Sequence, residues 1–470
     1  MRAVLLAFVL AAAGTALGAV PAGTSGPDRI DSVNGSRDTI RCGGGRDIVV
    51  ADQKDVVSSD CEVLTRRIGL DTTTTSGAQH RAVVEPSAAG DGNTVVAVFQ
   101  SGRYLDGGAA AIGWATSVDG GLTWQRGVLV DAGTERVSDP VVVHDGVRGV
   151  WLAAVLSVLE AETRILIYRS TNGIAWSEPI VAASGVPPPR ASIGLDKEWL
   201  ACDNRPLSPR RGACYLAYTD VAAGRIGVRS SADAGATWGA AVTTGPQGGE
   251  GPVGAIPTVA PDGTLVVVYA TTDLGALEAV YSVDGGTTFA PPVRIATVAT
   301  RSVLLRAPPL PSVTETRSGV LAVWPDCSAH PACTSNDIAI SESSDGKTWG
   351  APRVMAQGGD YVTPTIGAFG DAVAVLSYVR IDPFCCRLGI RLFRSSDGGV
   401  TWAPPTRLDA RPMQIPWLAR SATQGGTVGF LGDYEAVAFS GTRAVPVFTA
   451  ALSPGVGSTR QDLYATTRLP

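Results

Sequence analysis

The chain has 470 residues, including 56 glycines and 31 prolines, 17% of its residues are charged, and its formal net charge is −5. This composition is typical of many short strands joined by tight turns and argues against a helical or disordered chain. The acidic balance and the lack of any block of like charges argue against nucleic acid as a partner.

The first 22 residues have the pattern of a secretory signal peptide. Arg2 precedes an apolar run that becomes rich in small residues, and Ala19 and Ala22 are the expected cleavage positions. An uncleaved anchor is the alternative, but the run falls short of the roughly 20 strongly apolar residues that a span needs. We therefore expect a secreted protein that has no membrane span after cleavage and is a monomer.

Residues 26–62 differ in character from the rest of the chain. Asp38 and Asp47 are nine positions apart, each has an apolar residue two positions later, and Gly43 and Gly45 lie between them. The segment resembles a degraded RTX-type calcium repeat, in which stacked turns bring carbonyls and carboxylates around a hard cation. The resemblance implies calcium as a cofactor, and a small cap with aspartates in ordinary turns is the alternative. The carboxylates that would hold the ion are Asp38, Asp47, Asp52 and Asp55.

Eight cysteines fall in close sequence pairs, and an exported protein is expected to oxidise them. Local disulfides are the simplest interpretation. The expected pairs are Cys42 with Cys61, Cys202 with Cys214, Cys327 with Cys333, and Cys385 with Cys386. A zinc site is disfavoured because the chain has three histidines and none has ligand spacing to a cysteine pair.

A short pattern of seven or eight residues recurs six times. The copies are SVDGGLTW (117–124), STNGIAW (170–176), SADAGATW (231–238), SVDGGTTF (282–289), SSDGKTW (343–349) and SSDGGVTW (395–402). Aspartate and glycine suit a tight turn in which the carboxylate bonds backbone N–H groups, and the closing aromatic residue fills apolar space beneath. The residue types therefore indicate structural turns and not catalytic ones.

Strand-like runs surround each copy. A short alternating apolar run precedes it, a run containing proline usually follows it, and two further runs come earlier, as in GAIPTVAPDG followed by TLVVVYA. Their closing aromatic residues are 51 to 62 positions apart. Four strands in each repeat of this length predict the blades of a β-propeller.

The six copies resemble the Asp-box, or BNR, repeat of the sialidase superfamily over roughly residues 80–470. Sialidases have six blades, but GDYEAVAFSG, RAVPVFTA and DLYATTR after the last copy supply three inner strands of another blade. Its outer strand would come from residues 61–70, which closes the ring by joining both ends of the chain. We predict an all-β propeller of four-stranded antiparallel blades over residues 63–470, with seven blades favoured and six as the alternative.

The predicted strand order places functional residues on one rim. The turns between second and third strands, and the links between blades, share the rim opposite the Asp-boxes, where propellers usually bind ligands. Aspartates at or beyond second strands form an acidic arc there: Asp220, Asp273, Asp326 and Asp382. Links between blades add residues of which several would point into the channel: Arg81, Glu85, Arg190, Asp196, Lys197, Glu198, Glu250, Arg306, Asp360, Tyr361, Arg411, Asp433, Tyr434 and Glu435.

The sialidase resemblance implies exo-α-sialidase chemistry on a glycan. Such chemistry uses three arginines on a sugar carboxylate, a tyrosine nucleophile activated by a glutamate, and an aspartate acid/base. The catalytic candidates are Tyr434, Glu250 and Asp326, and the substrate-binding candidates are Arg81, Arg306, Arg411, Asp220, Asp273 and Asp382. The chain has no Arg-Ile-Pro motif, which usually marks true sialidases.

Two alternatives stay open for the function. A pair of carboxylates facing the channel would also hydrolyse a glycosidic bond, at a separation of about 5–10 Å. A non-catalytic propeller that binds carbohydrate or a cell surface would use the same fold, because propellers host both kinds of function.

Overall fold

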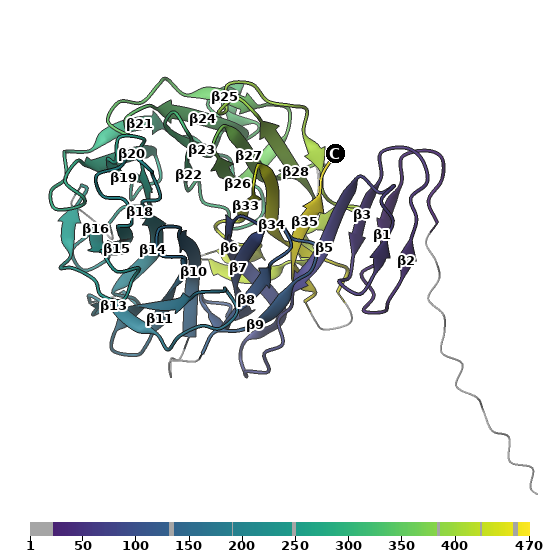
Figure 1. Cartoon of the computed structure of the whole chain (residues 1–470), viewed down its shortest axis with the longest axis horizontal. Coiled ribbons are helices and arrows are strands. Elements are labelled where there is room, and N and C mark those ends of the chain that lie inside the picture. The colour runs from purple at the N-terminus through teal and green to yellow at the C-terminus, as the bar shows by residue number, and fades with distance from the viewer. Residues whose placement is uncertain are drawn as a thin grey trace, which may run out of the picture.

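The computed structural model describes residues 22–130, 136–189, 191–246, 251–382, 386–423, 425–454 and 459–470, so the predicted signal peptide lies almost wholly outside the described residues. These residues form a ring of antiparallel sheets with a small stack of strands beside it (Figure 1). The helices among them are two short 3-10 segments, η1 (Pro331–Cys333) and η2 (Ile415–Trp417). In this part of the chain no helix is long and apolar enough to cross a membrane. The fold is the all-β propeller that the repeats predict.

Six sets of four antiparallel strands follow one another along the chain, and the first strand of each set faces the centre of the ring (Figure 1). The first three blades are β6 (Gln79–Asp91), β7 (Thr94–Arg103), β8 (Ala109–Ser117) and β9 (Gln125–Val128); β10 (Arg136–Asp145), β11 (Val150–Val158), β12 (Thr163–Ser170) and β13 (Ile180–Gly185); and β14 (Leu195–Cys202), β15 (Cys214–Asp220), β16 (Arg225–Ser231) and β17 (Val242–Thr244). The next three are β18 (Val253–Val259), β19 (Leu265–Ala270), β20 (Ala276–Ser282) and β21 (Val293–Thr297); β22 (Ser312–Glu315), β23 (Val320–Asp326), β24 (Asp337–Ser343) and β25 (Arg353–Ala356); and β26 (Asp360–Phe369), β27 (Ala372–Arg380), β28 (Arg387–Ser395) and β29 (Thr406–Arg407).

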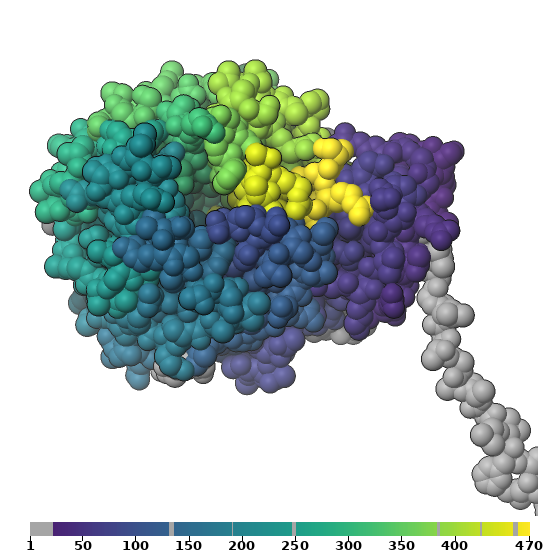
Figure 2. Space-filling model, viewed as in Figure 1, coloured from purple at the N-terminus to yellow at the C-terminus, as the bar shows by residue number. Residues whose placement is uncertain are grey.

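A seventh set of strands joins the two ends of the propeller. β33 (Ala436–Ser440), β34 (Arg443–Ala451) and β35 (Gln461–Arg468) pair in chain order, and β5 (Val63–Gly69) pairs antiparallel with β35. Residues 61–70 thus supply the outer strand that the sequence predicts for them. In the space-filling view the N-terminal residues lie against the C-terminal ones beside the ring (Figure 2). These pairings form a seventh four-stranded set.

The residues before β5 form a short parallel coil. β1 (Arg29–Asp31), β3 (Ile48–Ala51) and β5 pair in parallel, as do β2 (Thr39–Ile40) and β4 (Val56–Val57). Ile40, Val49 and Leu64 form its small core together with the disulfide-bonded Cys42 and Cys61. The coil therefore runs directly into the propeller through the strand they share.

Adjacent blades bury their facing side chains against each other. One buried cluster joins Val266 and Val268 on β19 to Ala322 and Trp324 on β23 of the next blade. Successive side chains of a strand point to opposite faces, and here both faces of an inner strand are covered. This is why the second strand LVVVYA is apolar at every position and buried throughout.

The Asp-boxes form tight turns between third and fourth strands. In the first copy Asp119 accepts the backbone N–H and the hydroxyl of Thr123, at 2.9 and 2.6 Å, and Ser117 Oγ accepts the N–H of Gly121 at 2.7 Å. The second copy, which has Asn172 in place of aspartate, keeps its backbone contacts at 2.9 Å. The boxes therefore act as turn-forming groups on one rim of the ring.

Three of the predicted cysteine pairs form disulfides. They are Cys42–Cys61, Cys202–Cys214 and Cys327–Cys333. For the fourth predicted pair, Cys385 lies outside the described residues. Each of the three bonds closes a short loop, which restricts the unfolded chain and so favours the folded one.

Two of the links between blades are long. They connect different pairs of blades but contact each other. Residues 298–311 link β21 to β22, and residues 408–435 link β29 to β33. The second link holds β30 (Met413–Gln414), η2, β31 (Ala419–Thr423) and β32 (Gly426–Phe430). The links join where the Gly429 carbonyl accepts the Arg306 N–H at 3.0 Å. They form one wall of the candidate site.

Candidate functional site

A cavity of about 550 Å³ opens among the links and turns on the rim opposite the Asp-boxes. Its charged lining comes from β14, from residues 298–311 and from the segment before β33, and consists of Asp196, Lys197, Arg301, Arg306 and Asp433. Hydroxyl and aliphatic side chains such as Thr272 and Leu310 complete the wall. A cavity with a few converging polar groups among apolar ones is typical of a ligand site.

Lys197 is the centre of a buried ion-pair network. Its Nζ lies 2.7 Å from Asp433 Oδ2, 3.4 Å from Glu85 Oε1 and 3.5 Å from Asp139 Oδ1. The lysine belongs to the third blade, whereas the carboxylates come from the first blade, the second blade and the segment before the seventh. All four side chains are buried, and buried charges need partners of this kind. The network therefore ties several inner strands to one another.

The same backbone irregularity, a β-bulge, positions three of these side chains. Glu85, Asp139 and Lys197 each lie at a β-bulge in the first strand of their blade, with φ of 52°, 47° and 51°. A bulge breaks the alternation of the strand and redirects a side chain, and a positive φ costs a residue with a Cβ about 1–3 kcal/mol. Thr363 lies at the corresponding bulge of the sixth blade, with φ of 50°. The same strained bulge therefore recurs at one level of the inner strands, and in three of them it carries a charged side chain of the network.

Burial drives several acids of the network toward their neutral form. It raises the pKa of Glu85 to about 7, and the charges of Asp139 and Asp433 add to this effect while Lys197 opposes it. Burial also raises the pKa of Asp139 and of Asp196, and raises the pKa of Glu198 well above its ordinary value. Neither carboxyl oxygen of Glu198 has a hydrogen-bond partner among the described residues. Burial therefore favours the protonated form of these acids over the form they would have in water.

Asp433 behaves in the opposite way. Burial opposes its charge, but Lys197 and Arg306 outweigh burial and hold its pKa well below the ordinary value. Arg306 donates from Nε to Oδ1 at 3.1 Å and from Nη2 to Oδ2 at 2.6 Å, a two-bonded geometry that fixes the carboxylate. The cavity thus has an ionised carboxylate, Asp433, and an acid with a raised pKa, Asp196, in the same wall.

Tyr434 belongs to the network but is buried within it. Its hydroxyl donates to the Pro140 carbonyl at 3.3 Å, and its ring packs edge-on against Trp199 with centroids 5.0 Å apart. Burial, with the nearby acids, raises the pKa of Tyr434 well above its ordinary value, which disfavours the phenolate. Glu250, its predicted partner, lies outside the described residues.

The three predicted sugar-binding arginines are not brought together. Arg306 lines the large cavity, whereas Arg81 is exposed in β6 and Arg411 lines a separate cavity of about 40 Å³ beside the parallel coil. The second arginine of the large cavity is Arg301, whose guanidinium lies 3.6 Å from Asp360.

The four aspartates of the predicted rim arc contact residues close to them in the chain. These contacts are Asp220 with Ala223, Asp273 with Thr271, Asp326 with Ser328, and Asp382 with Arg387. None of the four lines the large cavity. Their positions are those of residues that shape turns, and Asp326 in particular is buried.

The predicted calcium ligands are buried. Three of them accept backbone N–H groups, whereas Asp38 accepts the side-chain amide of Asn34 at 2.6 Å. Asp52 accepts the N–H of Gly35 at 2.6 Å, and Asp55 accepts the N–H of Asp38 at 2.9 Å. Asp47 accepts a backbone N–H through one oxygen, and its other oxygen has no partner among the described residues. These bonds use most of the carboxylate oxygens in turn formation.

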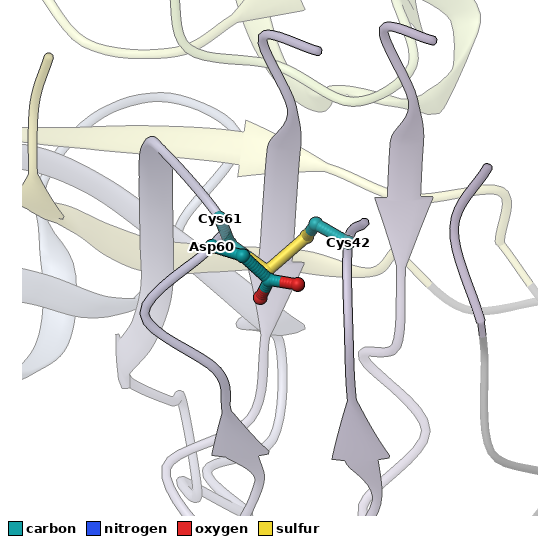
Figure 3. Close-up of side chains that lie close together, drawn as sticks. All are labelled: Cys42, Asp60 and Cys61. Carbon is teal, nitrogen blue, oxygen red and sulfur yellow. A yellow bond between two sulfur atoms is a disulfide. The ribbon is translucent and has the colours of Figure 1, made fainter. Parts of the chain in front are cut away.

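The potential metal ligands that do lie close together within the described ranges are Cys42, Asp60 and Cys61 (Figure 3). The two sulfur atoms are joined in a disulfide, so they are not available as thiolate ligands. The described residues thus do not gather the predicted carboxylates around one point, and calcium binding stays a prediction.

Asp139 and Arg103 contact the network but are not among the residues predicted from the sequence. Asp139 had a usable signal, because Asp139-Pro140 repeats Glu85-Pro86 in the first strand of the next blade. Arg103 had no such signal. It ends the second strand of its blade, and its buried side chain lies over the ring of Phe430, which belongs to the link between β29 and β33.

Comparisons with known proteins give distant structural likenesses. No model of a known protein family matches the chain. No curated protein matches it either. Similar solved structures include the α-L-arabinofuranosidase Arb93A from Fusarium graminearum (TM-score 0.45, 17% identity, covering 74% of this chain and 98% of that one). They also include a Hadza microbial sialidase, Hz136 (0.43, 17%, 66% and 66%), and a protein of unknown function from Dyadobacter fermentans (0.43, 17%, 67% and 95%). The propeller assignment rests on the strand pairings of this chain.

Proposed function

We propose that this propeller is a glycoside hydrolase that acts on a glycan held in the large cavity. The observation that carries the proposal is a pair of carboxyl groups, Asp196 and Asp433, that line one cavity and have pKa values shifted in opposite directions. Glycosidic bond cleavage uses two carboxyl groups in different protonation states, and the opposite pKa shifts of this pair favour such a difference.

Each of the two carboxyl groups has a role that fits its environment. Asp196 is the general acid, because burial raises its pKa and so favours the protonated form that donates to the leaving oxygen of the glycosidic bond. Asp433 is the ionised partner: both of its oxygens are bonded to Arg306 and Lys197, so its role is to stabilise the positive charge that develops on the sugar carbon. Arg306 orients Asp433 through two hydrogen bonds, and Lys197 donates a third.

An acidic sugar is the substrate class that the charges of the cavity favour. Arg301 and Arg306 line it together with Lys197, and guanidinium groups pair well with carboxylates. Exo-α-sialidase activity is therefore the specific form of the proposal. It would proceed through the aspartates, since the Tyr434 hydroxyl is buried and bonded to a carbonyl.

Secretion belongs to the same proposal. Three disulfides are expected of a protein that folds in an oxidising compartment, and glycans on surfaces are reached from there. The predicted signal peptide is consistent with this location.

The test is fluorophore release from 4-methylumbelliferyl glycosides, with an α-sialoside, a uronide and a neutral pentoside in parallel. We expect turnover of an acidic substrate, and a loss of about 10²–10⁴-fold in kcat for Asp196→Asn and for Asp433→Asn. Asp371→Asn, on the Asp-box rim, is the matched control and should keep the wild-type rate. Glycan-array binding without turnover would instead support the non-catalytic carbohydrate-binding propeller. If neither binding nor turnover is seen, both functions are excluded.

A further inference from the structure

Phe430 ends the hairpin β31–β32 at the junction of the two long links. Its carbonyl accepts a hydrogen bond from Gln461 Nε2 at 3.1 Å, and Gly429 beside it forms a parallel bridge with Leu305 and accepts the Arg306 N–H at 3.0 Å. The Phe430 side chain is fully buried. Backbone bonds on both sides therefore hold the ring in one place.

Two guanidinium groups lie over this ring. The Cζ of Arg306 is 4.9 Å from the ring centroid, and the Cζ of Arg103 is 4.4 Å from it. Both distances fall within the range of about 6 Å over which the negative face of an aromatic ring attracts a cation. The two arginines repel each other, and the negative face of the ring attracts both guanidinium groups.

Arg306 connects this ring to the cavity. Its guanidinium contacts Phe430 and at the same time forms both hydrogen bonds to Asp433, at 3.1 and 2.6 Å. A flexible arginine side chain has many rotamers, so holding it in this geometry needs contacts beyond the carboxylate itself.

We propose that Phe430 is a positioning residue, whose ring holds the Arg306 guanidinium in the orientation that fixes Asp433 in the cavity wall. The contact between the Phe430 ring and Arg306 is a property of the folded protein, whereas the effect of this contact on catalysis rests on the proposed function.

A double-mutant cycle in urea unfolding tests the hold without any substrate. Phe430→Leu and Arg306→Met are measured singly and together, and a buried cation–π contact predicts coupling of about 3- to 30-fold in the unfolding equilibrium constant. The control cycle replaces Phe430→Leu with Phe448→Leu, an equally buried ring that contacts Tyr464. It should give coupling below about twofold. Coupling below twofold at Phe430 would overturn the proposal.

A second substitution keeps the test decisive if Phe430→Leu does not fold. Incorporation of 3,4,5-trifluorophenylalanine at position 430 keeps the shape of the ring and weakens the negative charge on its face. Arg306→Met should then cost less in the fluorinated protein than in the natural one, and an equal cost would contradict the cation–π contact.

The kinetic constants of glycoside turnover test the catalytic consequence. When Arg306 is released, Asp433 loses its two-bonded orientation, so Phe430→Leu should lower kcat at least about threefold with little change in KM, while Phe448→Leu leaves both constants unchanged. An unchanged kcat would overturn the link to Asp433. Absence of turnover in the wild-type protein would count against the proposed function alone, because the unfolding cycle still decides the positioning role.

Discussion

Removal of the central ammonium by Lys197→Met should destabilise the protein strongly. Lys197 Nζ has three buried carboxylates at 2.7, 3.4 and 3.5 Å. With an effective dielectric constant of about 20, Coulomb's law gives roughly 5–6 kcal/mol for each pair before desolvation is subtracted. Loss of one partner from a buried ion pair costs about 3–5 kcal/mol once desolvation is included, and we expect a loss in this range at pH 8.

The chain offers a matched control for this substitution. Lys347 pairs with Asp262 at 3.0 Å on the surface, so Lys347→Met removes the same side chain from an exposed ion pair and should cost at most about 1 kcal/mol. Urea unfolding followed by tryptophan fluorescence measures both variants. The Lys197→Met penalty should shrink at pH 5, where Glu85, whose pKa is about 7, is already protonated. A penalty below 1 kcal/mol, or one that grows at pH 5, would refute the reasoning.

Three further predictions concern individual groups. Because the pKa of Glu85 rises from 4.5 to about 7 on folding, the native state binds its proton more tightly, and stability should fall as the pH rises between these values. In urea unfolding, Glu85→Gln should remove up to roughly 3 kcal/mol of that fall. Equal slopes of the unfolding free energy against pH in the two proteins would contradict this prediction. Hydrogen bonds, the strongest from Thr401 and the next from Ser395, lower the pKa of Asp397 to about 2. Its contribution to stability is therefore present above its ordinary pKa and is lost as the pH falls toward 2. Asp397→Asn should therefore lose less stability than wild type during acid unfolding between pH 4 and 2, and an unchanged acid transition would contradict this. The calcium hypothesis for residues 26–62 predicts a lower melting temperature in EDTA, and an unchanged one would count against a structural ion.

The repeat explains why much of the fold is predictable from the sequence. Each Asp-box combines an aspartate, glycines and an aromatic residue at fixed positions, so local turn chemistry marks the third and fourth strands of each blade. Counting strand-like runs from those marks also leads to the pairing of residues 61–70 with the C-terminal strand, a contact between distant parts of the chain.

The site was harder to predict because its geometry depends on bulges and on two long links. The sequence places Lys197, Asp196 and Asp433 on the correct rim, but ordinary strand alternation does not show which of them face the centre. A bulge shifts that alternation by one residue, as at Lys197. Arg306 lines the cavity because its link reaches Gly429 of another link, and no local pattern encodes such a contact.

The most direct test of the account compares wild type with Asp433→Asn on the best acidic glycoside at neutral pH. We expect turnover by the wild-type protein and a loss of at least about 100-fold in kcat for the variant, with the folded state of both proteins verified by urea unfolding. Equal turnover by the two proteins would contradict the claim that the carboxylate held by Lys197 and Arg306 is needed for the chemistry.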